Sequence, residues 1–132
     1  MFNSNGQPVA LHEQADAPFQ AGFVDVSPEG NITGIDSRSL APGTTLTIDT
    51  RNSRYRLTTL GGRGRHVLVQ GGSFFSEGTK ARLDGSTAGG SSIRIGWIGT
   101  DLHLEIAVGR RRFVTSSVRS IRIEPFRSTR SL

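Results

Sequence analysis

The residue types of a serine hydrolase are present in this 132-residue chain, but their spacing matches no hydrolase pattern. Its three histidines are His12, His66 and His103, and no Gly-x-Ser-x-Gly sequence occurs to hold a nucleophile at a sharp turn. A triad is defined by geometry, so residue types alone are weak support for one. The chain also lacks cysteine, which excludes thiolate nucleophiles and cysteine-ligated metals. We therefore expect no catalytic residues and a protein that is not an enzyme.

Metal binding has one candidate pair, His103 and Glu105. The two residues are two apart in an alternating segment, so their side chains would share one strand face and could contact the same ion. A structural zinc site needs about four ligands, and no third or fourth ligand stands out nearby. We interpret the pair as part of a solvated sheet face, and we expect no metal and no other cofactor.

The segment 84–92, DGSTAGGSS, is rich in Gly, Ser and Thr. Such a loop could hold an anion on its backbone N–H groups. It is not a P-loop, because the Gly-Lys-Ser/Thr ending is missing and no helix is expected after it. The pattern favours a plain connection between two strands, and it identifies no small-molecule substrate.

Arginine is the residue type that points most directly to a partner. The net charge is +5, and fifteen of the sixteen basic residues are arginine, whose planar fork suits carboxylates and phosphates. A codon bias would also explain this preference. Arginines scattered over turns protect strand edges from aggregation, whereas arginines gathered on one face form a phosphate-binding stripe. The candidate polyanion-binding residues are Arg54, Arg56, Arg110, Arg111, Arg112, Arg119 and Arg122.

Charge is sorted along the chain, which a codon bias does not explain. Residues 1–37 carry five acidic and no basic residues, a charge of −5, and residues 38–132 carry +10. This division predicts an acidic N-terminal arm over 1–38, with a hairpin at 23–35, a basic β-domain over 39–126 and an arginine-containing tail over 127–132.

Residues 1–20 of the arm have too little periodic apolar content to form a core of their own, so their order must come from docking. Our leading hypothesis is a self-associating, non-enzymatic β-domain that forms a homo-oligomer when the arm docks on a neighbouring subunit. An arm folded back on its own domain is the alternative arrangement. A nucleic-acid or polyanion-binding module is the second functional hypothesis, and an enzyme of an unrecognised class is the third. The candidate assembly anchors are Phe2, Leu11 and Phe19.

Short alternating segments joined by glycine-containing turns fill the rest of the chain, and residues 102–108 show the clearest alternation. Seven to nine such segments at a spacing of roughly ten residues predict an all-β fold, a small antiparallel barrel or sandwich. Tyr55, Trp97, Phe74 and Phe75 take positions that look core-facing. The period of two predicts burial of Leu46, Ile48, Leu57, Val67, Val69, Ile95, Trp97, Leu102, Leu104, Ile106, Val118 and Ile121.

Four sequence blocks have a familiar combination: NSRYRL at 52–57, GSTAGGS at 85–91, GWIG at 96–99 and TSSVRSI at 115–121. Together, over about residues 44–124, they resemble a group of small all-β bacterial proteins. The resemblance implies a compact β domain and carries no activity.

Hydropathy and the N-terminal residues bear on location. No apolar run approaches the roughly 18 residues that cross a bilayer, and the first residues lack the basic and apolar regions of a secretory signal. We therefore expect a cytoplasmic protein with no membrane partner.

Overall fold

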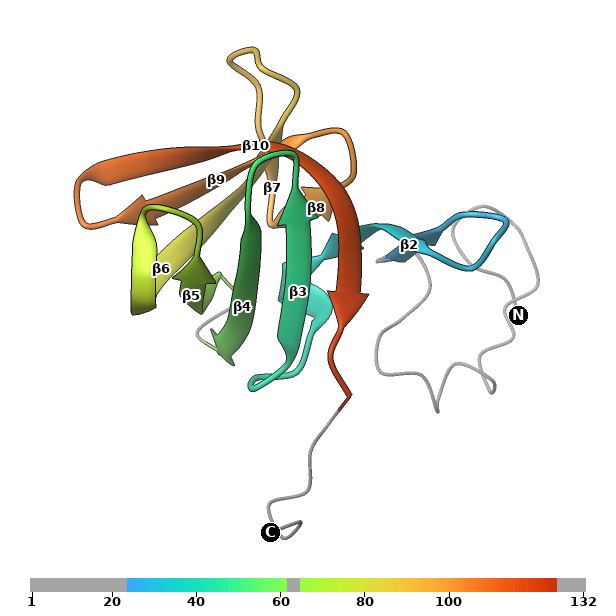
Figure 1. The fold of residues 1–132 in the computed structure, drawn as a ribbon, viewed down its shortest axis with the longest axis horizontal. Coiled ribbons are helices and arrows are strands. Elements are labelled where there is room, and N and C mark those ends of the chain that lie inside the picture. Colours follow the sequence, from blue (N-terminus) through green and yellow to red (C-terminus); the bar gives the residue numbers. More distant parts are fainter. Residues whose placement is uncertain (1–23, 62–64, 126–132) are drawn as a thin grey trace, which may run out of the picture.

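The computed structural model describes residues 24–61 and 65–125, which form a single antiparallel sheet of ten strands (Figure 1). The all-β fold predicted from the sequence is confirmed. The elements are β1 (Val24–Val26), β2 (Ile32–Asp36), the short 3-10 helix η1 (Ser37–Ser39), β3 (Thr45–Thr50), β4 (Arg54–Gly61), β5 (His66–Gly71), β6 (Phe75–Thr87), β7 (Arg94–Ile95), β8 (Trp97–Gly99), β9 (His103–Val108) and β10 (Arg111–Ile123).

Six of these strands close into a ring, in the order β3, β4, β5, β6, β9, β10 and back to β3. Two long, bent strands make the closure possible. The first half of β10 pairs with β9 and its second half with β3, while β6 pairs with β5 and then with β9. Closing the ring pairs both edges of these six strands, while β1 and β7 lie at the ends of the sheet outside the ring.

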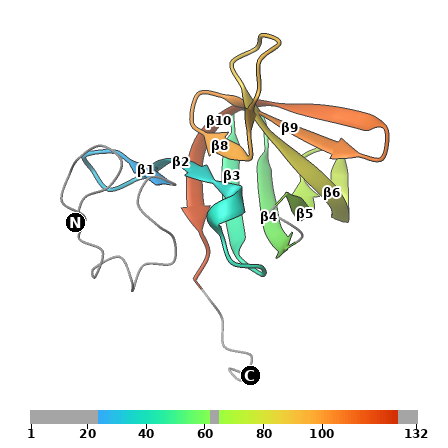
Figure 2. The same ribbon diagram turned by 180° about the vertical axis from the view of Figure 1, so that it is seen from behind.

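The β1–β2 hairpin forms where the sequence predicted a hairpin, and it projects from the side of the ring (Figures 1 and 2). β2 is nevertheless attached to the ring, because it pairs with β10 and with β8. Gly34 permits this attachment, since a Cβ atom there would lie 2.1 Å from the ring of Trp97. Ile35 of β2 is fully buried in the same core as the barrel side chains. The domain division at residue 38 stays a prediction.

The predicted core is buried except for two of its residues. Ile95 is 46% exposed, because β7 is only two residues long and Gly96 then turns the chain with a φ of 74°. That turn breaks the alternation, so Trp97 is buried and Ile95 is not. Leu102 is half-buried, in the turn before β9 where Asp101 has a φ of 68°. Both predictions assumed an unbroken extended strand.

A bulge in β10 explains a burial pattern that strict alternation does not. Val118 and Ile121 are both buried although they are three residues apart, and the pairing with β3 shifts between Val118 and Ser120. The extra residue of a bulge returns the next side chain to the core face. A separate difference concerns the loop predicted to begin at residue 84. Strand β6 continues to Thr87, so this loop begins at residue 88.

Candidate polyanion-binding surface

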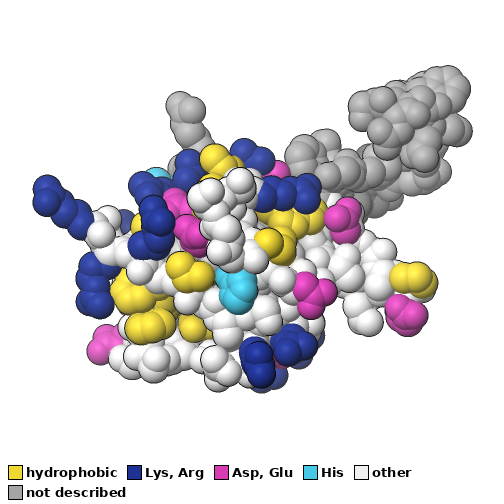
Figure 3. Space-filling model, turned by 90° about the horizontal axis from the view of Figure 1, so that it is seen from above, with side chains coloured by type: hydrophobic (Ala, Val, Ile, Leu, Met, Phe, Trp, Pro, Cys, Tyr) yellow, Lys and Arg dark blue, Asp and Glu magenta, His cyan; other side chains and the backbone are white. Residues whose placement is uncertain are grey.

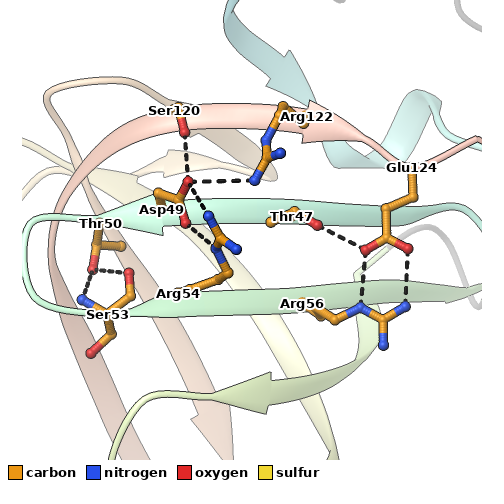
Figure 4. A network of polar contacts seen from close by, with 9 residues as sticks. All are labelled: Thr47, Asp49, Thr50, Ser53, Arg54, Arg56, Ser120, Arg122 and Glu124. Atoms are coloured by element: carbon orange, nitrogen blue, oxygen red, sulfur yellow. Dashed lines mark hydrogen bonds and ion pairs between the residues drawn. The ribbon is translucent and has the colours of Figure 1, made fainter.

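Three of the predicted arginines lie on the outer face of β10, β3 and β4, and all three are ion-paired (Figure 4). Arg54 contacts Asp49 at 2.6 Å, and Arg56 contacts Glu124 at 2.9 Å through a two-pronged hydrogen bond. Arg122 lies 3.5 Å from the same Asp49 carboxylate that Arg54 contacts. We call these five residues the paired face.

Strand register sets these contacts. Asp49 and Arg54 are direct partners across β3 and β4, and side chains directly opposite each other on one face are close enough to interact. Ser120 of β10 also donates to Asp49, and Thr47 of β3 donates to Glu124. The hydrogen bonds from Arg54 and then Ser120 hold the pKa of Asp49 below its usual value, against the opposing effect of desolvation.

The paired face therefore carries little free charge. Three guanidinium groups share two carboxylates, and hydrogen bonds to the partner carboxylates raise the pKa values of Arg54 and Arg56. A phosphate arriving at this face would compete with a carboxylate already in place. Three of the seven predicted arginines gather on this face, but their guanidinium groups contact carboxylates of the same chain.

The hairpin formed by β9 and β10 presents the other predicted cluster. It projects from the barrel on the side opposite the β1–β2 hairpin (Figure 1), and its turn contains Gly109 with a φ of 60°. Arg112 lies 3.7 Å from Glu105, too far for a hydrogen bond. Within the described part of the chain, neither Arg110 nor Arg111 has a carboxylate within ion-pair distance.

Aromatic rings lie beside one of these arginines. The Arg111 guanidinium is 5.0 Å from the ring centre of Phe113, and the Phe113 ring is 4.9 Å from Phe74 and 5.1 Å from Phe75. Phe74 was predicted to face the core, but it is 55% exposed. The reason is that β6 begins at Phe75, whose side chain is buried, while Phe74 still belongs to the preceding turn. We call Phe74, Arg110, Arg111 and Phe113 the hairpin patch.

On the face shown in Figure 3, basic side chains do not merge into one continuous surface. They are interleaved there with acidic and hydrophobic side chains. Of the seven predicted arginines, three belong to the paired face and three to the β9–β10 hairpin. Arg119 is exposed on β10 between these two groups, and no ion pair to it occurs among the described residues.

The histidines do not assemble a site in the described residues. The Nδ1 atom of His103 lies 2.8 Å from the carbonyl oxygen of Thr115, and His66 is exposed at the start of β5, while His12 lies outside the described residues. No group of three or more His, Asp or Glu side chains that could hold a metal ion occurs among residues 24–61 and 65–125. In the same ranges no helix is long and apolar enough to cross a membrane.

The anchors proposed for assembly, Phe2, Leu11 and Phe19, lie outside the described residues. Residues 24–37 of the acidic segment are among the described residues, and there the Asp36 carboxylate is already ion-paired with Arg38. This carboxylate accepts hydrogen bonds from the backbone N–H and the guanidinium of Arg38, at 2.8 to 2.9 Å. The Arg38 side chain is the main reason that the pKa of Asp36 lies below its usual value.

Comparisons with known protein families, with curated proteins and with solved structures found no match for this chain. Its function is therefore inferred from the geometry of the paired face and of the hairpin patch.

Proposed function

We propose that this domain binds single-stranded nucleic acid through the hairpin patch. The observation that carries the proposal is the exposed ring of Phe74, which packs on Phe113 beneath the Arg111 guanidinium. Exposed aromatic rings that stack with bases, next to cations that contact phosphates, are the two features shared by proteins that bind single strands.

The state of the arginines favours the hairpin patch over the paired face. Arg110 and Arg111 can contact a phosphate without giving up a carboxylate partner in the described chain, whereas Arg54 would have to release Asp49, which it contacts at 2.6 Å. Phosphate binding releases counterions and makes the affinity salt-dependent. The gain in binding free energy is greatest for an arginine that has no carboxylate partner of its own in the protein.

A single strand fits the patch better than a duplex. A ring at a projecting turn can stack only on a base whose face is free, and the bases of a duplex are already stacked on their neighbours. Phe74 would take the base, and Arg110 and Arg111 would contact the flanking phosphates.

The first test compares two double variants with equal loss of charge: Arg110→Ala with Arg111→Ala, and Arg54→Ala with Arg56→Ala as the control. Binding of a fluorescein-labelled single-stranded oligonucleotide of mixed sequence is measured by anisotropy at several salt concentrations. The first variant should lower the slope of log affinity against log salt by about 1.4, which is about 0.7 for each phosphate that the protein no longer neutralises. The control should change the slope less. Equal effects of the two variants would overturn the assignment to the hairpin patch.

The second test removes the aromatic ring. Phe74→Ala should weaken binding by about 1–3 kcal/mol, the loss typical of one base–aromatic stack. Val26→Ala, which removes another exposed apolar side chain on β1, should leave binding unchanged. No measurable binding of the unmodified protein at low salt would refute the proposed function.

Self-association is the second candidate function, and an edge of the sheet supports it. β1 lies at the edge of the sheet, it directly follows residues 1–23, and its Val26 is 56% exposed. Unpaired backbone groups on such an edge can pair with a strand of a second copy. Light scattering at micromolar concentrations should then give a mass above that of the monomer, which Val26→Lys should lower while Val114→Lys, on the exposed face of β10, should not. A monomeric protein would exclude this candidate.

A further inference from the structure

A hollow of about 370 Å³ lies on the outer surface of the barrel, where the loop after β6 stands over β9 and β10. This volume is at the lower end of the range for small-molecule sites. The loop 88–92 projects from the top of the barrel in Figure 1. The lining residues come from the segment 90–93, from β6, β7, β9 and β10, and from the residue before β5: Arg65, Asp84, Gly90, Ser91, Ile93, Ile95, Glu105 and Arg112.

A glycine lies at the centre of three strands beside the hollow. Gly85 of β6 pairs with Ile95 of β7 on one side and with Glu105 of β9 on the other, so no side chain stands between those two. Strand spacing of about 4.8 Å puts the backbones of Ile95 and Glu105 about 10 Å apart. Gly85 has a φ of 146°, and a Cβ atom there would lie 2.1 Å from the carbonyl oxygen of Arg94, so another residue is strongly disfavoured.

The polar groups of the hollow are not all satisfied. The side chain of Glu105 is only 14% exposed, yet its closest ionic partner among the described residues is Arg112 at 3.7 Å, and it accepts no hydrogen bond from them. The Nε atom of Arg65 is buried without a hydrogen-bond partner. Asp84, by contrast, accepts hydrogen bonds from both Arg65 and Arg82. The Glu105 oxygens remain open to the hollow and have no hydrogen-bond donor among the described residues, so Glu105 is the acceptor available to a ligand that brings a donor.

We propose that the hollow binds a free α-amino acid with an aliphatic side chain. The ammonium and carboxylate groups of an α-amino acid are bonded to one carbon and lie side by side, as the opposite charges of Glu105 and Arg112 do. The ligand ammonium donates to Glu105, and the ligand carboxylate accepts from Arg112. The aliphatic side chain then lies against Ile93 and Ile95, the latter being 46% exposed.

A purely anionic or purely cationic ligand fits less well. An anion would bring its charge next to Glu105 and Asp84, and a cation would bring its charge next to Arg112 and Arg65. A ligand with both charges can place its cationic group beside Glu105 and its anionic group beside Arg112, so neither charge meets only a like charge. This inference is independent of the proposed nucleic-acid binding, because Phe74, Arg110, Arg111 and Phe113 do not line the hollow.

The test is a titration of the ¹⁵N-labelled full chain followed by NMR, with four matched probes. L-Leucine carries both charges and the aliphatic group, 4-methylpentanoate lacks the ammonium, 3-methylbutylamine lacks the carboxylate, and glycine lacks the aliphatic group. L-Leucine at about 1 mM and above should shift the amide signals of Gly90, Ser91 and Ile95 more than any other probe. Equal or stronger binding of either singly charged probe would overturn the proposal, as would the absence of shifts with L-leucine.

Two variants locate the site. Glu105→Gln keeps the shape of the side chain and should weaken L-leucine binding about tenfold or more, the usual range for a lost charged hydrogen bond. Arg119→Gln, an exposed arginine elsewhere on β10, should leave the affinity unchanged. The spectrum of each variant reports whether it is folded. If Glu105→Gln is folded and binds L-leucine as well as the unmodified protein does, the assignment of the ammonium to Glu105 is wrong.

Discussion

The paired face and the hairpin patch are built from the same residue type, yet they differ in what the arginines contact. On the paired face, the carboxylates of Asp49 and Glu124 lie 2.6 to 3.5 Å from arginines of β4 and β10. On the β9–β10 hairpin, Arg111 has an aromatic neighbour in Phe113, and neither Arg110 nor Arg111 has a carboxylate partner among the described residues. Counting arginines therefore does not locate a binding surface, because a carboxylate on the neighbouring strand decides which of them is available.

The difference has a physical origin in strand register. The outer positions of β3 include Asp49, which lies between Arg54 of β4 and Arg122 of β10. Glu124 follows the end of β10 and lies beside Arg56 of β4. In the hairpin the partner strand offers only Glu105, which faces Arg112. The consecutive arginines at 110–112 cannot all lie on one face, because successive side chains of a strand alternate.

The largest expected effect tests whether the two regions belong to one cooperative unit. Leu104 of β9 is fully buried in the core that also holds Ile48 of β3. Leu104→Ala should cost about 2–5 kcal/mol in the free energy of unfolding, and both regions should unfold together. Urea unfolding followed by the fluorescence of Trp97 and by far-UV circular dichroism should give coincident transitions. Separate transitions would mean that the hairpin unfolds on its own.

The next effect contrasts an ion pair whose carboxylate is buried, Asp36 with Arg38, with the exposed pairs. Asp36 is 8% exposed and accepts three hydrogen bonds from Arg38, so Asp36→Asn should cost about 1–3 kcal/mol. Because its folded-state pKa is below the ordinary value of about 3.9, the stability it contributes is present above that pH. That contribution is lost as the pH falls through the lower, folded-state pKa.

Thermal melts between neutral pH and the acid limit check this prediction. Asp36→Asn should flatten the decline of the melting temperature at acid pH. Asp49→Asn is the matched comparison, because its pKa is also lowered but its side chain is 29% exposed, so the effect should be smaller. A variant Asp36→Asn that keeps the full acid dependence would contradict the assignment.

Local alternation predicted the fold and most of the core, and its failures have specific causes. Leu104 and Ile106 follow the alternation of an uninterrupted strand and are buried. Ile95 fails because Gly96 turns the chain, and Phe74 fails because it precedes the strand rather than opening it. These failures depend on backbone turns that the pattern of apolar residues does not encode.

The candidate site was harder to predict than the fold. Arg54 and Arg56 do share a strand face, as the sequence predicted, but their neutralisation depends on Asp49 and on Glu124, the latter 68 residues away from Arg56 in sequence. Such a contact follows from the order of strands in the sheet, which a single sequence does not supply. The exposed ring of Phe74 against Phe113 depends on the same long-range pairing. The hollow beside Glu105 requires β7 and β9 to flank Gly85.

A third prediction tests whether the carboxylates of the paired face are what keep its arginines from binding phosphate. Asp49→Asn with Glu124→Gln leaves three arginines without these partners, so this face should gain affinity for a single-stranded oligonucleotide. The slope of log affinity against log salt should steepen by up to about 2, or about 0.7 for each additional phosphate that the protein neutralises. The control, Asp101→Asn with Glu77→Gln, changes the net charge equally at exposed positions away from the paired face. A similar gain in both variants would show that net charge matters and local pairing does not.

The smallest expected effect is on the free energy of unfolding. Its sign should differ between an arginine of the paired face and an arginine of the hairpin patch. Arg56→Ala removes an exposed pair with Glu124, whose contribution is about 0–1 kcal/mol after screening by solvent and salt. Arg110→Ala removes a side chain that is next to two further arginines and has no ion-pair partner among the described residues, so it should leave stability unchanged or raise it slightly by relieving repulsion. Thermal melts at low and high salt measure both. Added salt should reduce the difference between the variants, because it screens the attraction on one surface and the repulsion on the other. If Arg110→Ala destabilises the domain as much as Arg56→Ala does at low salt, Arg110 has a structural partner, and the hairpin patch holds less available charge than the proposed function requires.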